Sequence, residues 1–183
     1  GAAINGNFPY GGFTSPGTPY ISYAGDRFYV ASGGYLYRRS IASPGTVDLK
    51  STTISTVSTA ADIVVTKGYV YAATTEGTGS VTRFDEGDLT VTATYAVGTA
   101  ISLPLSLPDQ RMYITPADNT LKAVKISDMS TARSITYSQP AANSGAAYAI
   151  HYGSDIYTCG GTFVYKIADD GVNPLSQTWA TSA

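Results

Sequence analysis

The sequence predicts an all-β protein built from a repeated unit, and three observations lead to this prediction. The 183 residues include 24 Thr, 19 Ser, 15 Tyr and 19 Gly. Threonine and tyrosine suit half-buried pleated strands, whereas glycine suits tight turns. Only 13% of the residues are charged, and Lys, Glu and Leu, which populate helix surfaces, are scarce. The third observation is a short strand motif that recurs four times.

The recurring motif centres on a tyrosine in a short strand-like run. The four runs are Arg27–Val30, Tyr69–Ala72, Arg111–Ile114 and Asp155–Thr158. Their tyrosines, Tyr29, Tyr71, Tyr113 and Tyr157, are separated by 42, 42 and 44 residues. A turn-forming pair precedes each run, and a base follows each tyrosine after nine or twelve residues: Arg38, Arg83, Lys125 and Lys166. Four such matches at nearly constant spacing indicate an internal repeat.

Each repeat is expected to contain four short strands. In the second repeat they are predicted at 62–66, 68–74, 80–85 and 89–97, and in the third at 102–107, 111–115, 120–127 and 132–137. A period of about 40–45 residues with four strands per repeat is typical of a β-propeller, in which each repeat is one blade. We therefore predict four blades at 19–58, 59–98, 99–143 and 144–183, preceded by an N-terminal extension over 1–18.

The third repeat carries a family resemblance. The segment from Val97 to Thr115, followed by Asp118–Leu121 and Val124–Ile126, is similar to the Tyr-Val-Thr-Asn propeller repeat. That group includes surface-layer and lactonase-like propellers, and the resemblance extends over about residues 19–180. It implies a propeller fold but leaves the function open, because the family contains binding modules, structural proteins and enzymes.

The sequence leaves the closure of the ring open. Four blades are the lower end of the known range of about 4–8. The repeats could form a closed four-bladed ring, belong to a longer polypeptide, or form an arc that another chain completes. In each case the apolar residues of the inner strands, such as Val64, Val70, Ile150 and Ile156, are expected to face the next blade.

Charge and cysteine content exclude several classes of protein. The net charge is −2, whereas a nucleic-acid-binding protein normally carries a basic face. No apolar run reaches the roughly 18 residues of a membrane helix. The single cysteine, Cys159, cannot form an internal disulfide, and we expect it to be a small buried residue. Low charge with abundant Ser, Thr and Tyr suggests an extracellular, cell-surface or virion protein.

Few residues suggest metal or anion chemistry. His151 is the only histidine, and we expect it on the inner strand of the fourth repeat as a channel-mouth ligand or a structural residue. Clustered acidic oxygens suit calcium, although Asp and Gly also build tight turns. The calcium candidates are Asp85, Asp88, Asp169 and Asp170. The four repeated bases are expected to form a solvated stripe rather than an anion-binding ring, and no cofactor is expected.

Our first hypothesis is a non-enzymatic propeller that recognises protein partners, or copies of itself, through loops on one face of the disc. Loops on a rigid scaffold commonly carry recognition. The candidate residues are Pro108, Asp109 and Gln110 in one such loop, together with the tyrosines Tyr10, Tyr20 and Tyr23. One alternative is a fragment of a lactonase- or quinoprotein-like enzyme whose catalytic groups lie elsewhere. Another is a lectin with one sugar site per blade.

Overall fold

The computed structural model describes nine segments of the chain, which together contain fifteen strands. The segments are 20–32, 34–52, 60–66, 68–74, 79–97, 111–114, 120–136, 149–160 and 163–182. These segments contain strands and turns only, which agrees with the all-β prediction. A helix long and apolar enough to cross a membrane does not occur among them.

The strands form four antiparallel sheets, each ordered as in the sequence. We call them blades 1 to 4. Blade 1 contains β1 (Tyr20–Ala24), β2 (Arg27–Ser32), β3 (Tyr35–Ser40) and β4 (Val47–Lys50). Blade 2 contains β5 (Ala60–Thr66), β6 (Tyr69–Thr74), β7 (Ser80–Asp85) and β8 (Val91–Ala96). Blade 3 contains β9 (Arg111–Ile114), β10 (Thr120–Lys125) and β11 (Thr131–Thr136). Blade 4 contains β12 (Ala149–Tyr152), β13 (Asp155–Gly160), β14 (Phe163–Ala168) and β15 (Ser176–Ser182). The strand predicted at 102–107 lies outside the described residues.

The turn between the first and second strands requires glycine. Gly25, Gly68 and Gly153 occupy this turn in blades 1, 2 and 4, with φ of 60°, 79° and 64°. No atom lies within 4 Å of a Cβ placed on any of them, so the backbone conformation, rather than space, selects glycine.

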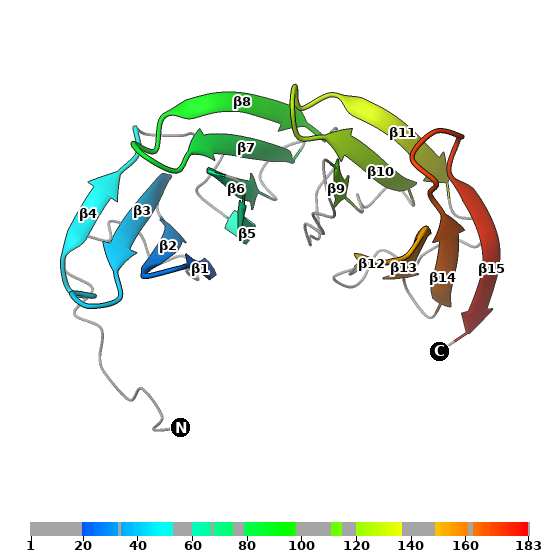
Figure 1. The fold of residues 1–183 in the computed structure, drawn as a ribbon, viewed down its shortest axis with the longest axis horizontal. Coiled ribbons are helices and arrows are strands. Elements are labelled where there is room, and N and C mark those ends of the chain that lie inside the picture. Colours follow the sequence, from blue (N-terminus) through cyan, green and yellow to red (C-terminus); the bar gives the residue numbers. More distant parts are fainter. Residues whose placement is uncertain are drawn as a thin grey trace.

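The four blades stand side by side in an open arc (Figure 1). The innermost strands β1, β5 and β12 lie toward the centre of the arc, and β4, β8, β11 and β15 form its convex outer side. Blades 1 and 4 occupy opposite ends of the arc and do not close a ring. The open arc, and not a closed four-bladed ring, is therefore the arrangement in this structure.

The hydrophobic core lies between consecutive blades, at three contacts that we call joints. The joint of blades 1 and 2 buries Tyr29, Ala31, Leu36, Ile63, Val70, Ala72, Phe84 and Leu89. The joint of blades 2 and 3 buries Tyr71, Ala73, Val81, Tyr95, Val97, Met112, Ile114, Val124 and Met129. The joint of blades 3 and 4 buries Tyr113, Leu121, Ala123, Ile156, Tyr165, Ile167 and Leu175. Each blade thus shields the apolar face of its neighbour from water.

The expected orientation of the inner apolar residues was partly wrong. Val64 packs toward blade 3 as expected, but Val70 and Ile156 face the preceding blade, because neighbouring positions on paired strands alternate between the two faces of a sheet. No described blade follows blade 4, and Ile150 is 65% exposed.

Candidate functional site

A β-bulge at the same place in every blade fixes which residues are equivalent. The register between the third and fourth strands shifts once in each sheet. In every blade, the residue before the shift also pairs with the repeated tyrosine on the second strand. These residues are Arg38, Arg83, Ala123 and Lys166. Lys125, which the spacing had aligned with the arginines, pairs with Arg111 instead and is exposed. That alignment was wrong.

Arg38 and Arg83 hold consecutive blades together. Each is only 9% exposed, so the predicted solvated stripe is wrong for these two residues. The Nη1 atom of Arg38 donates to the main-chain oxygens of Glu86 and Gly87, at 2.8 and 3.1 Å. Arg83 donates in the same way to Ile126 and Ser127. The guanidinium groups therefore fix the turn between the third and fourth strands of the next blade, which we call its outer turn.

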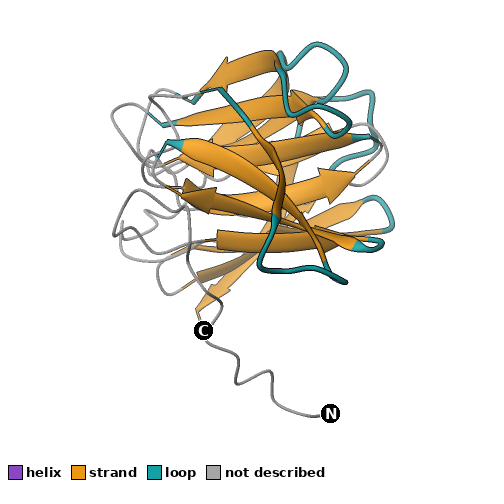
Figure 2. Ribbon diagram, turned by 90° about the vertical axis from the view of Figure 1, so that its left-hand side faces the viewer, coloured by secondary structure: helices purple, strands orange, loops and turns teal. Residues whose placement is uncertain are grey.

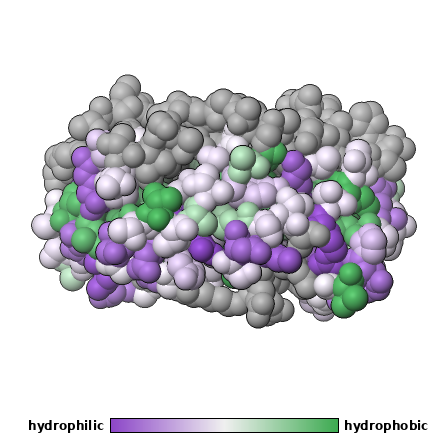
Figure 3. Space-filling view, turned by 90° about the horizontal axis from the view of Figure 1, so that it is seen from above, coloured by the Kyte–Doolittle hydropathy of each residue, from purple (hydrophilic) through white to green (hydrophobic). Residues whose placement is uncertain are grey.

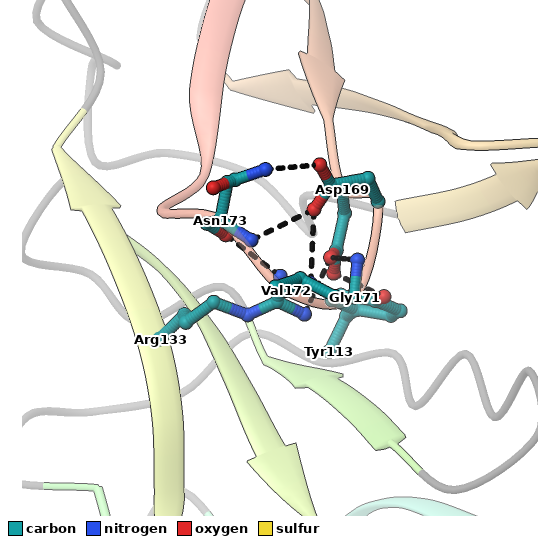
Figure 4. Close-up of polar contacts among 7 residues, drawn as sticks. Tyr113, Arg133, Asp169, Gly171, Val172 and Asn173 are labelled. Carbon is teal, nitrogen blue, oxygen red and sulfur yellow. Dashed lines mark hydrogen bonds and ion pairs between the residues drawn. The ribbon is translucent and has the colours of Figure 1, made fainter.

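At the third joint the arginine comes from the neighbouring strand. Ala123 occupies the register position of Arg83, and Arg133 in β11 pairs directly with it. Arg133 forms an ion pair with the buried carboxylate of Asp169, and its Nη1 donates to the main-chain oxygen of Asn173 at 2.9 Å. Figure 4 shows Arg133 and Tyr113 directed at this outer turn of blade 4.

The repeated tyrosines supply a second bond across the joints. The hydroxyl of Tyr29 donates to Oε1 of Glu86 at 2.8 Å, and that of Tyr113 donates to Oδ2 of Asp169 at 2.6 Å. Glu86 and Asp169 both follow the third strand of their blade, so the two bonds are equivalent. Burial and the bond to Glu86 raise the pKa of Tyr29 far above its usual value. Tyr29 therefore acts as a neutral donor at physiological pH.

The middle joint lacks this bond. Ile126 stands where blades 2 and 4 carry Glu86 and Asp169, and it has no side-chain acceptor. The buried hydroxyl of Tyr71 has no hydrogen-bond partner among the described residues. Burial raises the pKa of this hydroxyl. A different hydrogen bond crosses this joint, between the Tyr95 hydroxyl and Thr131 Oγ1, which lie 2.6 Å apart.

One face of the disc carries two sets of turns, and we call it the turn face. The main-chain bonds Ile41 to Asp26, Glu86 to Gly68 and Asp169 to Ser154 join the outer turns to the turns between first and second strands. Most of the described loops, which are teal in Figure 2, lie at one end of the strands.

Aspartate side chains stabilise the outer turns by accepting hydrogen bonds within them. Oδ1 of Asp88 accepts from the Thr90 amide at 2.9 Å, and Oδ1 of Asp128 accepts from the Ser130 amide at 3.0 Å. Asp170 accepts from three donors, which lowers its pKa to about 2. Hydrogen bonds from Thr90 and Ser130 likewise lower the pKa of Asp88 and Asp128.

Asp88, Asp169 and Asp170 lie in these outer turns, and Asp85 is the last residue of β7, directly before one of them. Asp85 and Asp169 accept from the amides of Gly87 and Gly171, while Asp88 and Asp170 are exposed. In the described part of the chain, no group of three or more His, Cys, Asp or Glu side chains could hold a metal ion. Calcium binding by these turns stays a prediction.

The other candidate residues are only partly described. The main chain of His151 lies in β12, opposite Ile156, and those of Tyr20 and Tyr23 lie in β1. Tyr10, Pro108, Asp109 and Gln110 lie outside the described residues, as does the predicted extension over 1–18. Their roles in binding stay predictions.

Cys159 is partly exposed, and not buried as expected. It pairs with Val164 in β13 and β14 of the last blade. Its equivalents Ala31 and Ala73 are buried because another blade covers them. The position of blade 4 at the end of the arc thus explains the exposure.

Exposed apolar side chains are concentrated on this last blade. The described large hydrophobic residues with high exposure are Ile41, Val91, Ile150, Tyr152, Val172 and Trp179. Figure 3 looks on the convex outer side, where hydrophilic and neutral side chains surround small, separate hydrophobic patches.

Comparison with known proteins identifies the fold. No protein-family model matches the sequence, and no curated protein matches it. Among solved structures, BamB from Moraxella catarrhalis is similar, with a TM-score of 0.68 and 12% identity over 91% of this chain and 52% of BamB. The WD40 β-propeller domain of Doa1 aligns with a TM-score of 0.64 and 13% identity over 89% of this chain and 52% of that chain.

A designed protein is similar over most of its own length. The computationally designed Ika4 protein aligns with a TM-score of 0.68 and 14% identity, over 85% of this chain and 93% of its own. The chain therefore spans about half the length of BamB and nearly all of Ika4. At these identities the likeness is one of fold, and the chain is an all-β protein of the β-propeller kind.

Proposed function

We propose that the chain is a non-enzymatic recognition module that binds a protein partner through its turn face. The observation that carries this proposal is the set of exposed, ionised aspartates that blades 2, 3 and 4 each place on an outer turn. Asp88, Asp128 and Asp170 are held by hydrogen bonds within their own turns, so they lose little conformational freedom when a partner binds. We also propose that the four blades form part of a secreted, cell-surface or virion assembly.

The charge of these turns defines the chemistry of the partner. Each carboxylate has a lowered pKa and is negative at neutral pH. Carboxylates fixed at intervals along one face complement a partner that presents lysine or arginine side chains at matching intervals. The partner is therefore proposed to be a protein surface or peptide with a basic patch.

Asparagine substitutions separate charge from turn structure. The triple variant Asp88→Asn, Asp128→Asn and Asp170→Asn keeps an oxygen acceptor in each turn but removes three negative charges. A control with the same change in net charge is Thr94→Lys, Ser134→Lys and Thr136→Lys, all exposed on outer strands. The probe is an array of basic, neutral and acidic peptides.

We expect the unmodified chain to bind basic peptides, and the asparagine variant to lose about tenfold in affinity. The lysine control should keep most of the binding, because its added charges lie away from the turn face. An equal loss in both variants would mean attraction by net charge alone, and no binding to basic peptides would contradict the proposal.

A further inference from the structure

The face of blade 4 that points away from blade 3 is apolar and uncovered, and we call it the open face. Cross-strand pairing places Ile150, Tyr157, Lys166 and Trp179 in one row across this face. Ile150, Tyr152 and Trp179 are 65%, 76% and 42% exposed. The Tyr157 and Trp179 rings pack edge to face, with their centroids 6.4 Å apart. Half of the described hydrophobic residues with high exposure thus lie together on one sheet face.

The open face repeats, position by position, the faces that form the three joints. Tyr157 is equivalent to Tyr29, Tyr71 and Tyr113, which are at most 1% exposed. Val164 is equivalent to the fully buried Leu36, Val81 and Leu121. On blade 4 both Tyr157 and Val164 are partly exposed. The open face therefore has the composition of a joint surface, and no blade in the described part of the chain covers it.

Blade 1 presents, at the opposite end of the arc, an outer turn equivalent to those that receive the preceding blade at the three joints. Its outer turn contains Ile41, whose amide donates to Asp26 as Glu86 donates to Gly68. At the other joints this turn accepts the arginine of the preceding blade. In blade 1 the Ile41 side chain is 54% exposed. Val30 and Tyr37 on the same face are already covered within the chain, so the outer turn is the accessible part.

We propose that a second copy of this chain covers the open face, with blade 1 of each copy packed on blade 4 of the other. The open face and the outer turn of blade 1 lie at opposite ends of one arc (Figure 1), so each of two copies can place its outer turn against the open face of the other. Two identical joints close the assembly, whereas a single unclosed joint would propagate into a filament.

The donors for the new joint are present on the open face. Lys166 has the register position of Arg38 and Arg83, and its Nζ currently lies 3.0 Å from Asp155. Tyr157 pairs with it, as Tyr29 pairs with Arg38. Lys166 is placed to reach the main-chain oxygens of the partner's outer turn at Ile41 and Ala42, as Arg38 reaches those of Glu86 and Gly87. This proposal uses a different surface from the turn face and does not rest on the proposed function.

Light scattering measures the assembly directly. We expect a mass twice that of the 19.1 kDa chain at micromolar concentration. Ile150→Asp or Trp179→Asp should return the mass to that of one chain, because each places a charge in the joint. Val91→Asp is the matched control, since Val91 is 45% exposed on β8 of the outer side. Circular dichroism verifies that each variant keeps its sheet structure.

A mixing experiment tests which surfaces meet. Ile41→Asp alone should also weaken pairing, because Ile41 lies in the other half of the joint. Mixing Ile41→Asp chains with Trp179→Asp chains should restore two-chain particles, since one of the two joints then contains only unmodified surfaces. If Ile41→Asp chains pair as well as unmodified chains, two open faces meet each other and the proposed ring is wrong.

The single cysteine reports on the same face. Cys159 lies on the open face, so its labelling by a maleimide should slow as two-chain particles form. A single-chain mass at all concentrations up to about 100 μM, which exceeds the usual dissociation constants of stable dimers, would overturn the proposal. Particles that keep growing beyond two chains would also overturn it, because they would indicate an open filament.

Discussion

Arg83 in β7 and Arg133 in β11 bind equivalent outer turns of the following blade from two different strands. Arg83 pairs with Ala93 across its sheet, whereas Arg133 pairs with Ala123 at the same register position. Arginine and alanine have therefore exchanged strands between blades 2 and 3. The exchange keeps one guanidinium and one small side chain at both of these joints, which indicates that the joint, rather than the strand, requires the arginine.

Arg133→Ala is expected to destabilise the fold by about 3–5 kcal/mol, because it leaves the carboxylate of Asp169 buried without its ion-pair partner. The double variant Ala123→Arg and Arg133→Ala should recover part of this loss by restoring the arrangement of blade 2. Chemical denaturation measures both free energies of unfolding. A double variant no more stable than Arg133→Ala would contradict the exchange.

Tyrosine-to-phenylalanine substitutions should differ between joints. Tyr113→Phe removes a hydrogen bond to a buried carboxylate and should cost about 1.5–3 kcal/mol. Tyr71→Phe removes a buried hydroxyl without a described partner, so it should be neutral or stabilising. The free energies of unfolding of the two variants provide the comparison, and equal losses would show that the bond to Asp169 contributes nothing particular.

The outer turns should make stability depend on pH in the acid range. The pKa of Asp170 is lowered to about 2 in the folded chain, so its contribution is present above the unfolded value near 3.8. That contribution is lost as the pH falls from about 5 toward 2. Asp170→Asn should therefore flatten the acid limb of a plot of unfolding free energy against pH. An unchanged acid limb would count against an energetic role of the turn bonds.

A complementary effect is expected at high pH. The pKa of Tyr29 is raised in the folded chain, so its contribution is complete below pH 10 and declines as the pH rises above that value. Tyr29→Phe should make the alkaline decline shallower without abolishing it, because Tyr71 and Tyr165 also have raised pKa values. Thermal melts between pH 8 and pH 11, where tyrosines begin to ionise, would measure the slope.

Residue spacing misidentified one member of the repeat for a physical reason. Lys125 follows Tyr113 by the same number of residues as Arg83 follows Tyr71. The register between the second and third strands differs by two residues, because Tyr71 pairs with a residue twelve positions later and Tyr113 with one ten positions later, so equal spacing does not give equal register. Register pairs Tyr113 with Ala123 instead. Arg133 can be identified as the arginine of the third joint only from its pairing with Ala123 across the sheet.

The sequence by itself determined the strands and their fourfold repetition, because alternating side chains and turn-forming residues act over a few neighbouring positions. The tertiary structure alone decided which face of each blade meets the next, and hence that Asp169 binds Arg133 and Tyr113. Such partners are far apart in the chain; the tyrosine–carboxylate bonds join residues 56 and 57 positions apart. Their pairing depends on packing between sheets, and the same packing leaves blade 4 with an apolar face that no other described blade covers.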